Sequence, residues 1–343
     1  MDALRLRTFS AISRIKKLST SPRSNTRLQS TLYTTSVDGS LSKRIPYNSW
    51  DSHMHVVDPS LQSLSPTATY TPSKLHTLSQ ALAFESTLGI RNLVLVQPSI
   101  YGYDNTCVIE ALKQLGPGHG RGVVCFDAAT INAKQRRGVN AGHSTLEIWH
   151  RLGVRGVRLN FVSVPQELSA KELERTLHEY ADIIRELGWV LQLYVPMHTI
   201  PDLVPIIPQL GVKVCLDHFG NPTLPVPSSV SSSPLPFNPY TLPGFTALIS
   251  LLEQGNTYVK ISGAYRLSDD SQFEHLGALA RELMRAGRER LVFATDWPHT
   301  RFEGVDIKPI TEVCLRWCVE EGADMTERLF RRNAEVLWDV KPV

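Results

Sequence analysis

Short runs of consecutive apolar residues recur after about residue 45, and longer segments with apolar residues three or four positions apart lie between them. Runs such as LVLV, VVCF and LVFA are typical of strands that are buried on both faces, as in parallel sheets. Eight segments have this strand-like character. They are Asn48–Val57, Asn92–Gln97, Gly122–Phe126, Gly156–Asn160, Val190–Val195, Val212–Asp217, Tyr258–Ser262 and Leu291–Thr295.

The segment Ala170–Leu187 carries the clearest helical pattern. Its apolar residues recur at three- and four-residue spacing, and a glycine follows it directly. Ser169 precedes the segment and Glu172 follows three residues later, which is a capping-box start. Two further segments, Leu276–Ala286 and Lys308–Glu321, are also predicted as helices.

Eight alternations of strand and helix in about 300 residues favour a (β/α)8 TIM barrel, an α/β fold, over a doubly wound sheet. No G-x-G-x-x-G follows the first strand, which removes the main sign of a dinucleotide-binding fold. Residues 221–243 interrupt the alternation, because they hold seven prolines and a cluster of serines. They follow the sixth strand, so a barrel would place them over its C-terminal face, as a lid or as a surface insertion.

Charge divides the chain of 343 residues, whose net charge is +3, into two parts. Nine basic and two acidic residues give residues 1–45 a charge of +7, and the other 27 basic and 31 acidic residues give residues 46–343 a charge of −4. We therefore predict a basic leader rich in Ser and Thr (1–45) and one barrel domain (46–343). The acidic body and the lack of a nucleic-acid motif argue against nucleic acid as a partner.

The leader carries Leu4, Phe9 and Ile12 among basic residues, so a helix there would be amphipathic, as in a mitochondrial transit peptide. A disordered basic tail without an address has the same composition. Five scattered cysteines, an odd number, favour a reducing compartment, and no run of 18 apolar residues occurs that would span a membrane. We expect an intracellular protein, in the mitochondrial matrix if the leader is a transit peptide and otherwise in the cytoplasm.

Polar residues gather at the C-terminal ends of the predicted strands, where barrel enzymes carry their active sites. His53 and His55 end the first strand and point to the same side, because they are two positions apart. His218 ends the sixth strand and Asp296 the eighth. Imidazoles bind metals or donate hydrogen bonds to an oxyanion, and a carboxylate serves as general base or metal ligand. Any one of these residues alone is as readily structural, but their joint occurrence predicts an enzyme.

The constellation resembles the amidohydrolase superfamily, in its amidohydrolase-related branch of lactonases and decarboxylases. Longer segments resemble the 2-pyrone-4,6-dicarboxylate lactonases, and with the His-x-His motif they span most of the predicted barrel. These segments are VQPSIYGYDN (96–105), GVRGVRLNF (153–161), LDHFGNP (216–222), YVKISGAYRL (258–267) and FATDWPH (293–299). The resemblance implies a TIM barrel and a hydrolase that acts on the carboxylic ester bond of a lactone.

The resemblance also implies a role for each motif residue. Asp296 would be the general base that activates water, and His53, His55 and His218 would polarise the lactone carbonyl. The substrate would be held by Ser99, Arg158, Tyr194 and Arg266. This is chemically consistent, because a carboxylate can take a proton from water and an arginine can bind a carboxylate with two hydrogen bonds. Arg158 lies within a strand, where an unpaired charge would be costly, and this favours a functional role.

Metal-dependent members of the superfamily usually add a strand-four lysine or a strand-five histidine to the site. Here strand four offers Arg158, and strand five has Tyr194 at the usual histidine position, as in the lactonases, which resemble a metal-free class. No cofactor is therefore expected. The alternative is a divalent metal such as zinc held by His53, His55 and Asp296, since three protein ligands and a water complete a tetrahedron.

Two arginines of the dicarboxylate lactonases are absent from this chain. The position after the strand-four arginine lies in FVSVP (161–165), and the position after His-Phe-Gly is Asn221. Because a bidentate arginine selects strongly for a carboxylate, we expect a lactone or ester with one carboxylate or none, aromatic or polyketide-like. Tyr101, Tyr103 and Trp297 are candidates to line such a pocket.

Three other functions compete with a lactonase that acts on a small-molecule lactone or ester. A metal-dependent decarboxylase would need a tightly bound divalent ion. A sugar-lactone hydrolase would need polar residues that recognise hydroxyl groups. A catalytically dead barrel would serve as a binding protein, against which the four retained motif residues argue. Neither a membrane nor a nucleic acid is expected as a partner.

Overall fold

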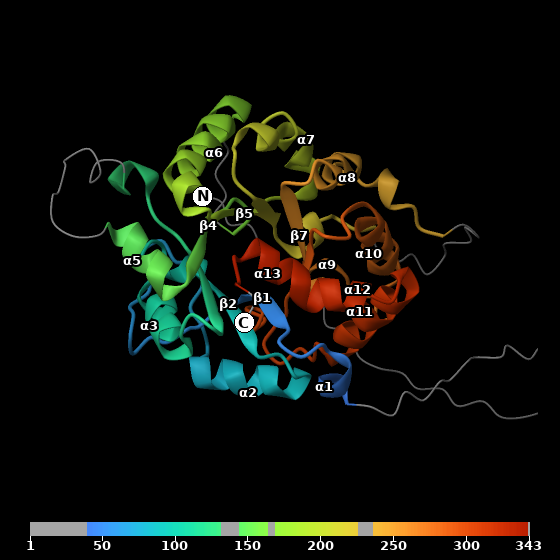
Figure 1. Ribbon diagram of the computed structural model, residues 1–343, viewed down its shortest axis with the longest axis horizontal. Helices are drawn as coiled ribbons and strands as arrows, with labels where there is room; N and C mark the ends of the chain where they lie inside the picture. The colour runs from blue at the N-terminus through green and yellow to red at the C-terminus, as the bar shows by residue number, and fades with distance from the viewer. Residues whose placement is uncertain (1–39, 132–143, 164–168, 226–235, 342–343) are drawn as a thin grey trace, which may run out of the picture. The chain divides into compact units, whose positions relative to one another are not determined.

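The computed structural model describes residues 40–131, 144–163, 169–225 and 236–341. Eight parallel strands follow one another around a barrel in the order β1 to β8, and the helices lie around them (Figure 1). The strands are β1 Trp50–Met54, β2 Asn92–Val96, β3 Gly120–Val124, β4 Val154–Asn160, β5 Val190–Tyr194, β6 Val214–Leu216, β7 Thr257–Ile261 and β8 Leu291–Phe293. All eight predicted strands and the predicted (β/α)8 fold are confirmed.

The residues after β8 close the barrel against β1. The backbone N–H of Asp296 donates to the carbonyl of His53 at 2.9 Å, and Met54 forms a parallel bridge with Trp297. The register between β1 and β2 shifts between Asp51 and Met54. Ser52 and His53, which lie within this irregular stretch, are both fully buried.

The helices confirm the sequence prediction where the periodic pattern was strongest. The predicted helices correspond to α6 Ala170–Ile184 with its 3-10 extension Arg185–Leu187, to α10 Glu274–Ala286 and to α11 Lys308–Glu321. Ser169 and Glu172 form the expected capping box. Further helices are α1 Leu41–Arg44, α2 Leu78–Leu88, α3 Thr106–Leu115, α5 Thr145–Leu152, α7 Ile200–Leu203, α8 Phe245–Glu253, α9 Ala264–Leu267, α12 Met325–Glu327 and α13 Asn333–Leu337, and Arg328–Arg332 forms a π-helical turn.

Parts of two predicted segments, the leader and the proline-rich segment, lie outside the described residues. Residues 1–39, which contain most of the predicted leader and the candidate transit peptide, lie outside the described residues. Leu41 and Ile45, at the end of that leader, are buried in the hydrophobic core of the barrel. Of the proline-rich segment 221–243, residues 226–235 also lie outside, and Pro239–Thr241 forms a 3-10 turn. Within the described ranges, no helix combines the length and apolarity needed to cross a membrane.

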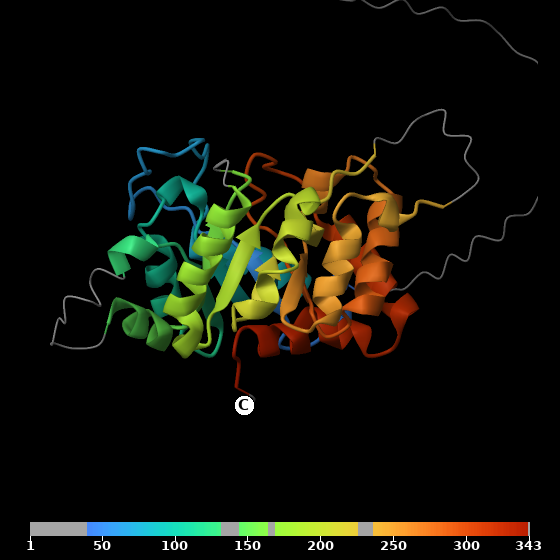
Figure 2. The same cartoon turned by 90° about the horizontal axis from the view of Figure 1, so that it is seen from above.

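The barrel interior is layered from apolar at the bottom to polar at the mouth. The lowest layer packs Trp50, Val94, Val123 and Tyr258 against the C-terminal helix α13 and Trp338. Figure 2 shows this red helix lying across the lower end of the strands. The indole of Trp338 donates to the Ser52 hydroxyl at 3.2 Å and lies under the Lys260 ammonium. The polar layers above therefore rest on an apolar floor.

Candidate active site

A cavity of about 150 Å³ opens at the C-terminal ends of the strands, as the fold predicts for an active site. Seven of the eight predicted site residues line it, and His53 lies fully buried beside them. The lining is His55, Tyr70, Pro98, Ser99, Arg158, Val162, Ser163, Tyr194, His218, Arg266, Asp296, Thr300 and Arg301. The structure thus brings together residues that lie in or after seven of the eight strands, all except β3.

The three predicted aromatic lining residues do not lie in this cavity. Tyr101 packs in a separate apolar cluster with Val57 and Ile100, and Tyr103 is exposed to solvent. Trp297 is buried against His76. That prediction was wrong, because strand and loop residues next to a motif follow the local backbone and need not face the same cavity.

The carboxylate of Asp296 lies at the centre of the mouth and accepts two short hydrogen bonds. Arg266 Nε donates to its Oδ2 at 2.6 Å, and the Tyr265 hydroxyl donates to the same oxygen at 2.7 Å. Burial would raise the pKa of Asp296, but the neighbouring His218 and Arg266 outweigh it and hold this pKa far below its ordinary value. Asp296 is therefore a carboxylate that stays ionised although it is buried.

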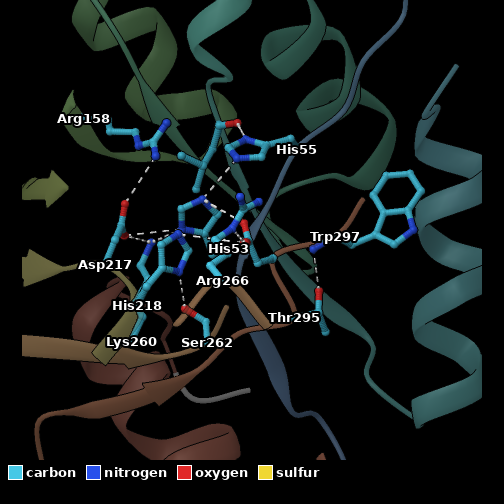
Figure 3. A network of polar contacts seen from close by, with 12 residues as sticks. His53, His55, Arg158, Asp217, His218, Lys260, Ser262, Arg266, Thr295 and Trp297 are labelled. Atoms are coloured by element: carbon cyan, nitrogen blue, oxygen red, sulfur yellow. Dashed lines mark hydrogen bonds and ion pairs between the residues drawn. The ribbon is translucent and has the colours of Figure 1, made fainter. Parts of the chain in front are cut away.

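A second ionised carboxylate, Asp217, lies beside His53 (Figure 3). Its oxygens contact Lys260 Nζ at 3.3 Å, Gln192 Nε2 at 3.1 Å and Arg158 Nη2 at 3.5 Å. Burial again favours the neutral acid, but the charge of Lys260 outweighs burial and holds the pKa of Asp217 well below its usual range. Asp217 and Lys260 are both fully buried, so they form a buried ion pair under the histidines.

The hydrogen-bond network assigns the proton positions on two of the three imidazoles (Figure 3). His55 Nδ1 lies 2.7 Å from the Val96 carbonyl, which only accepts, so Nδ1 carries the proton. The Nε2 of His55 is therefore bare, and His53 Nε2 donates to it at 3.2 Å. His53 Nδ1 lies 3.2 Å from the Lys260 ammonium and 3.3 Å from Asp217 Oδ1. Burial lowers the pKa of both rings, that of His55 to about 4, so both are neutral near pH 7.

His218 faces the cavity from the loop after β6. Its Nδ1 is hydrogen-bonded to the Ser262 hydroxyl at 2.8 Å, and its Nε2 lies 3.9 Å from Asp296 Oδ2. The serine can donate to Nδ1, which leaves a proton on Nε2 that points to the mouth. The backbones of both His218 (φ 51°) and Asp296 (φ 62°) are left-handed, a costly conformation for such residues. The two loops that carry the site are therefore held in strained shapes.

Arg158 presents unsatisfied donors to the cavity. Among the described residues, its guanidinium hydrogen-bonds only Asp217, at 3.5 Å, and its buried Nε has no hydrogen-bond partner. The guanidinium lies 5.7 Å from the centre of the Tyr194 ring. A buried arginine with free donors is costly unless a ligand completes its hydrogen bonds. Arg158 is thus suited to bind an anionic group.

A carboxyl pair outside the cavity supports the two strands that carry the site. Asp51 accepts the backbone N–H of His53 at 2.9 Å and that of Thr295 at 3.0 Å, and the Thr295 hydroxyl donates to it as well. Glu85 of α2 contacts the same hydroxyl at 3.3 Å. Burial raises the pKa of Asp51 to about 6, and burial together with Asp51 raises the pKa of Glu85 well above its ordinary value. This pair therefore retains protons that the mouth carboxylates lose.

Sequence reasoning missed several residues of the site. Lys260 is a charged residue within the apolar strand TYVKI, so its position alone was a usable signal. Tyr265 lies next to the predicted Arg266 and was overlooked. Tyr70 and Arg301 come from loops, where no periodicity indicates which side chains face the cavity.

Two groups of side chains have ligand atoms close enough together to hold a metal ion: His53, His55 and Asp296, and His53, Asp217 and His218. In the first group, His53 Nε2 lies 3.2 Å from His55 Nε2 and 3.8 Å from Asp296 Oδ1. These spacings are near those between ligands of a tetrahedral zinc ion with bonds of about 2.0–2.2 Å. The distances fit a metal, and Lys260 and Arg266 contact the other polar atoms of two of these residues, His53 Nδ1 and Asp296 Oδ2.

Comparisons with known proteins agree with this architecture. The sequence model of the amidohydrolase family matches residues 50–340. The chain is 28% identical over 267 residues to a 2-pyrone-4,6-dicarboxylate hydrolase of Comamonas testosteroni, covering 75% of this chain and 78% of that protein. It is also 28% identical over 307 residues to a 4-sulfomuconolactone hydrolase of Hydrogenophaga intermedia, covering 85% and 91%. A crystal structure from Pseudomonas putida, described as a candidate 2-pyrone-4,6-dicarboxylic acid hydrolase, superposes with a TM-score of 0.65 at 28% identity, covering 87% of this chain and 100% of that one.

Proposed function

The chain belongs to the amidohydrolase family, and from this premise we propose that it is a hydrolase that opens a lactone by adding water to its ester carbonyl. Two of its relatives carry the names of lactone hydrolases. The observation that carries the proposal most directly is the buried, ionised carboxylate of Asp296 at the wall of the mouth cavity. A lactonase needs such a group next to the carbonyl, because water must lose a proton as it attacks.

Asp296 is the general base in this mechanism. It accepts a proton from the water that attacks the lactone carbonyl, and a tetrahedral oxyanion forms. The ring C–O bond then breaks, and the leaving oxygen takes the proton back from Asp296. The products are a carboxylic acid, which loses its proton to solvent and becomes a carboxylate, and a hydroxyl group, or its keto form, on one open chain.

The oxyanion needs a hydrogen-bond donor that is already in place. His218 is the best-placed imidazole, because its Nε2 faces the cavity while its Nδ1 is held by Ser262. His55 also lines the cavity, but its Nε2 accepts from His53 and its Nδ1 donates to the Val96 carbonyl, so both of its ring nitrogens are engaged in the free site. His53 donates to His55 from beneath and acts as a positioning residue. From the sequence we expect all three histidines to polarise the lactone carbonyl. We propose this role for His218, with His53 as a positioning residue.

Arg266 links substrate binding to the base. In the free site its Nε bonds Asp296, which makes this carboxylate a weak base because its pKa is so low. A substrate carboxylate that binds Arg266 would compete for this guanidinium and let the pKa of Asp296 rise. Arg158, Tyr194 and Ser99 line the same cavity and are proposed to hold the rest of the substrate.

We propose that the reaction does not use a metal. Three cations, Lys260, Arg158 and Arg266, already face the two carboxylates Asp217 and Asp296. A dication added to this positive excess would be repelled in a poorly solvated site. If zinc did bind, His53, His55 and Asp296 would hold it, and it would activate water as a Lewis acid.

The experiment that tests the function is a panel of pyrones and sugar lactones assayed with and without a chelator, for wild type and for Asp296→Asn. We expect ring opening of at least one pyrone by the wild type that survives the chelator, and its loss in the variant. Stoichiometric zinc or manganese with decarboxylation of the substrate would instead identify the metal-dependent lyase. Turnover of sugar lactones alone would identify the sugar-lactone hydrolase.

A further inference from the structure

We propose that Lys260 is a positioning residue of the site, because its ammonium begins a hydrogen-bond chain that fixes the protons of His53 and His55 (Figure 3). The ammonium donates to His53 Nδ1 at 3.2 Å, and His53 Nε2 donates to His55 Nε2 at 3.2 Å. His55 Nδ1 then donates to the Val96 carbonyl at 2.7 Å. The effect of Lys260 on turnover rests on the proposed function, whereas the proton positions do not depend on it.

The two ends of this hydrogen-bond chain give it a direction. The ammonium of Lys260 has only donors and the main-chain carbonyl of Val96 only accepts, so every N–H between them points the same way. Each imidazole accepts on one nitrogen and donates with the other, which assigns one tautomer to each ring. Lys260 and His53 are fully buried, so water does not compete for the first of these hydrogen bonds.

Asp217 is the competing acceptor that makes Lys260 necessary. Its Oδ1 lies 3.3 Å from His53 Nδ1 and 3.3 Å from the Lys260 ammonium. Among the described residues this oxygen has no hydrogen-bond partner, so its contact with His53 is not a hydrogen bond. Without the ammonium, the carboxylate would face the lone pair of His53 Nδ1. A proton moved to Nδ1 would remove this repulsion and donate to the carboxylate.

Such an exchange of tautomer would disturb both histidines. With its proton on Nδ1, His53 would turn a lone pair at Nε2 toward the lone pair of His55 Nε2. His55 would then have to carry its proton on Nε2, and it would lose the hydrogen bond to the Val96 carbonyl. Because His55 lines the cavity, the loss of one buried ammonium would change the proton positions as far as the cavity wall.

The direction of the hydrogen-bond chain also matters for the proposed base. Both short hydrogen bonds to Asp296 end on Oδ2, which leaves Oδ1 to accept the proton of the attacking water. His53 Nε2 lies 3.8 Å from this Oδ1. The present tautomer places an N–H at that nitrogen, whereas the exchanged tautomer would place a lone pair there, which repels a carboxylate. Lys260 therefore acts on the base through His53, without lining the cavity itself.

The proton positions can be measured by ¹⁵N NMR of the full-length protein labelled at histidine, because protonated and bare ring nitrogens have well-separated shifts. Single substitutions of His53 and of His55 assign their signals. In the wild type we expect the proton on Nε2 of His53 and on Nδ1 of His55. In Lys260→Met we expect both rings in the opposite tautomer. A wild type with the proton on Nδ1 of His53 would overturn the proposal, whether or not the variant folds.

Kinetics separate positioning from substrate binding. Lys260→Met, assayed below its unfolding midpoint on a lactone that the wild type opens, should lower kcat by at least about tenfold and change KM by less than about threefold. The reason is that the ammonium does not contact the substrate. A kcat within about twofold of wild type, with the tautomers exchanged, would show that the proton positions do not matter for turnover and would overturn the positioning role.

A double variant separates positioning from stability. In Lys260→Met with Asp217→Asn no charge is left unpaired, and the asparagine amide can donate to His53 Nδ1 from the place of Asp217 Oδ1. We expect it to restore both tautomers and to bring kcat to within about fivefold of wild type. A folded double variant that recovers neither would contradict the proposal, as would wild-type tautomers in Lys260→Met.

Lys213→Met is the matched control. Lys213 directly precedes β6, and its ammonium donates to the Val336 carbonyl at 2.6 Å, at the opposite end of the strand from the cavity. This variant should change neither the histidine signals nor kcat, and changes equal to those in Lys260→Met would overturn the specific role of Lys260. The expected tautomers in a protein that opens no lactone of the panel would contradict the proposed hydrolase and leave the hydrogen-bond chain standing.

Discussion

Two pairs of buried carboxyl groups support or line the mouth of this barrel, and their surroundings shift their pKa values in opposite directions. Asp217 and Asp296 are surrounded by lysine, arginine and imidazole side chains and stay ionised. Asp51 and Glu85 are equally buried but face each other and a threonine, and they hold protons at higher pH. Buried carboxyl groups in the same part of the protein thus have pKa values shifted in opposite directions.

The difference shows what burial does without a partner. Desolvation favours the neutral acid in all four residues, and only the mouth supplies enough positive charge to reverse it. Asp51 can then serve as a structural acceptor for the backbone of β1 and of the segment after β8. Asp296, fixed in the ionised state, is the group that can take a proton from water. The direction of the pKa shift therefore distinguishes the supporting pair, Asp51 and Glu85, from the pair at the mouth, Asp217 and Asp296.

The largest effect on turnover should follow from removing the negative charge of Asp296. Asp296→Asn keeps the shape and removes the base, so we expect turnover to fall by about 10²–10⁴-fold with little change in the unfolding midpoint. Steady-state kinetics and thermal unfolding on the same preparation measure both. Activity retained within about tenfold would mean that Asp296 is not the base.

The next effect concerns the ion pair beneath the histidines. Lys260→Met leaves Asp217 buried without its ammonium, and this should lower the free energy of unfolding by about 3–5 kcal/mol. Denaturant titration gives the value. The double variant Lys260→Met with Asp217→Asn should recover much of the loss, because no charge is then left unpaired. Equal instability of the single and double variants would show that packing dominates over charge.

The free energy of unfolding as a function of pH tests the raised pKa of Glu85 in the supporting pair. The folded-state pKa of Glu85 is raised above its ordinary 4.5, so above that pH the folded protein holds a proton that the unfolded chain has lost. Stability should therefore fall with rising pH. Glu85→Gln removes this titration and should gain about 1.4 kcal/mol per pH unit relative to wild type above about pH 4.5. A pH-independent difference between the two proteins would contradict the raised pKa.

The smallest effect should come from Tyr265→Phe, which removes one of two short hydrogen bonds to Asp296. The pKa of Asp296 should rise, so the acidic limb of the profile of kcat/KM against pH should move to higher pH. The rate at neutral pH should change by less than about tenfold, because Arg266 remains bonded to the same oxygen. An unchanged acidic limb would separate Tyr265 from the base. Phe302 contacts the Tyr265 ring, and Phe302→Leu is a packing control that should leave the limb in place.

The fold and the positions of four motif residues could be predicted from the sequence. Buried parallel strands appear as continuous apolar runs, and this is why all eight were predicted, whereas boundaries shifted by a few residues. The His53, His55, His218 and Asp296 positions were found because chemistry at strand ends converges in a barrel. Whether they catalyse the reaction proposed here stays a prediction until it is measured.

What could not be read from the sequence depends on contacts between distant residues. The Nδ1 of His53 is contacted by Asp217 and by Lys260, and the lysine lies 207 residues away along the chain. Tyr70 and Arg301 meet only because two loops fold over the same rim. The prediction of one carboxylate or none counted arginines at homologous positions, so it did not include Arg301, which lines the same cavity from another loop.

The helix α13 and Trp338 also determine when the site is finished during synthesis. They form the floor beneath Lys260 but follow all eight strands along the chain. A nascent chain therefore exposes the Lys260 layer to water from below until residue 338 has emerged from the ribosome. The ion pair between Asp217 and Lys260 cannot be fully buried before then. The order of translation therefore delays formation of this ion pair until the eight strands have been synthesised.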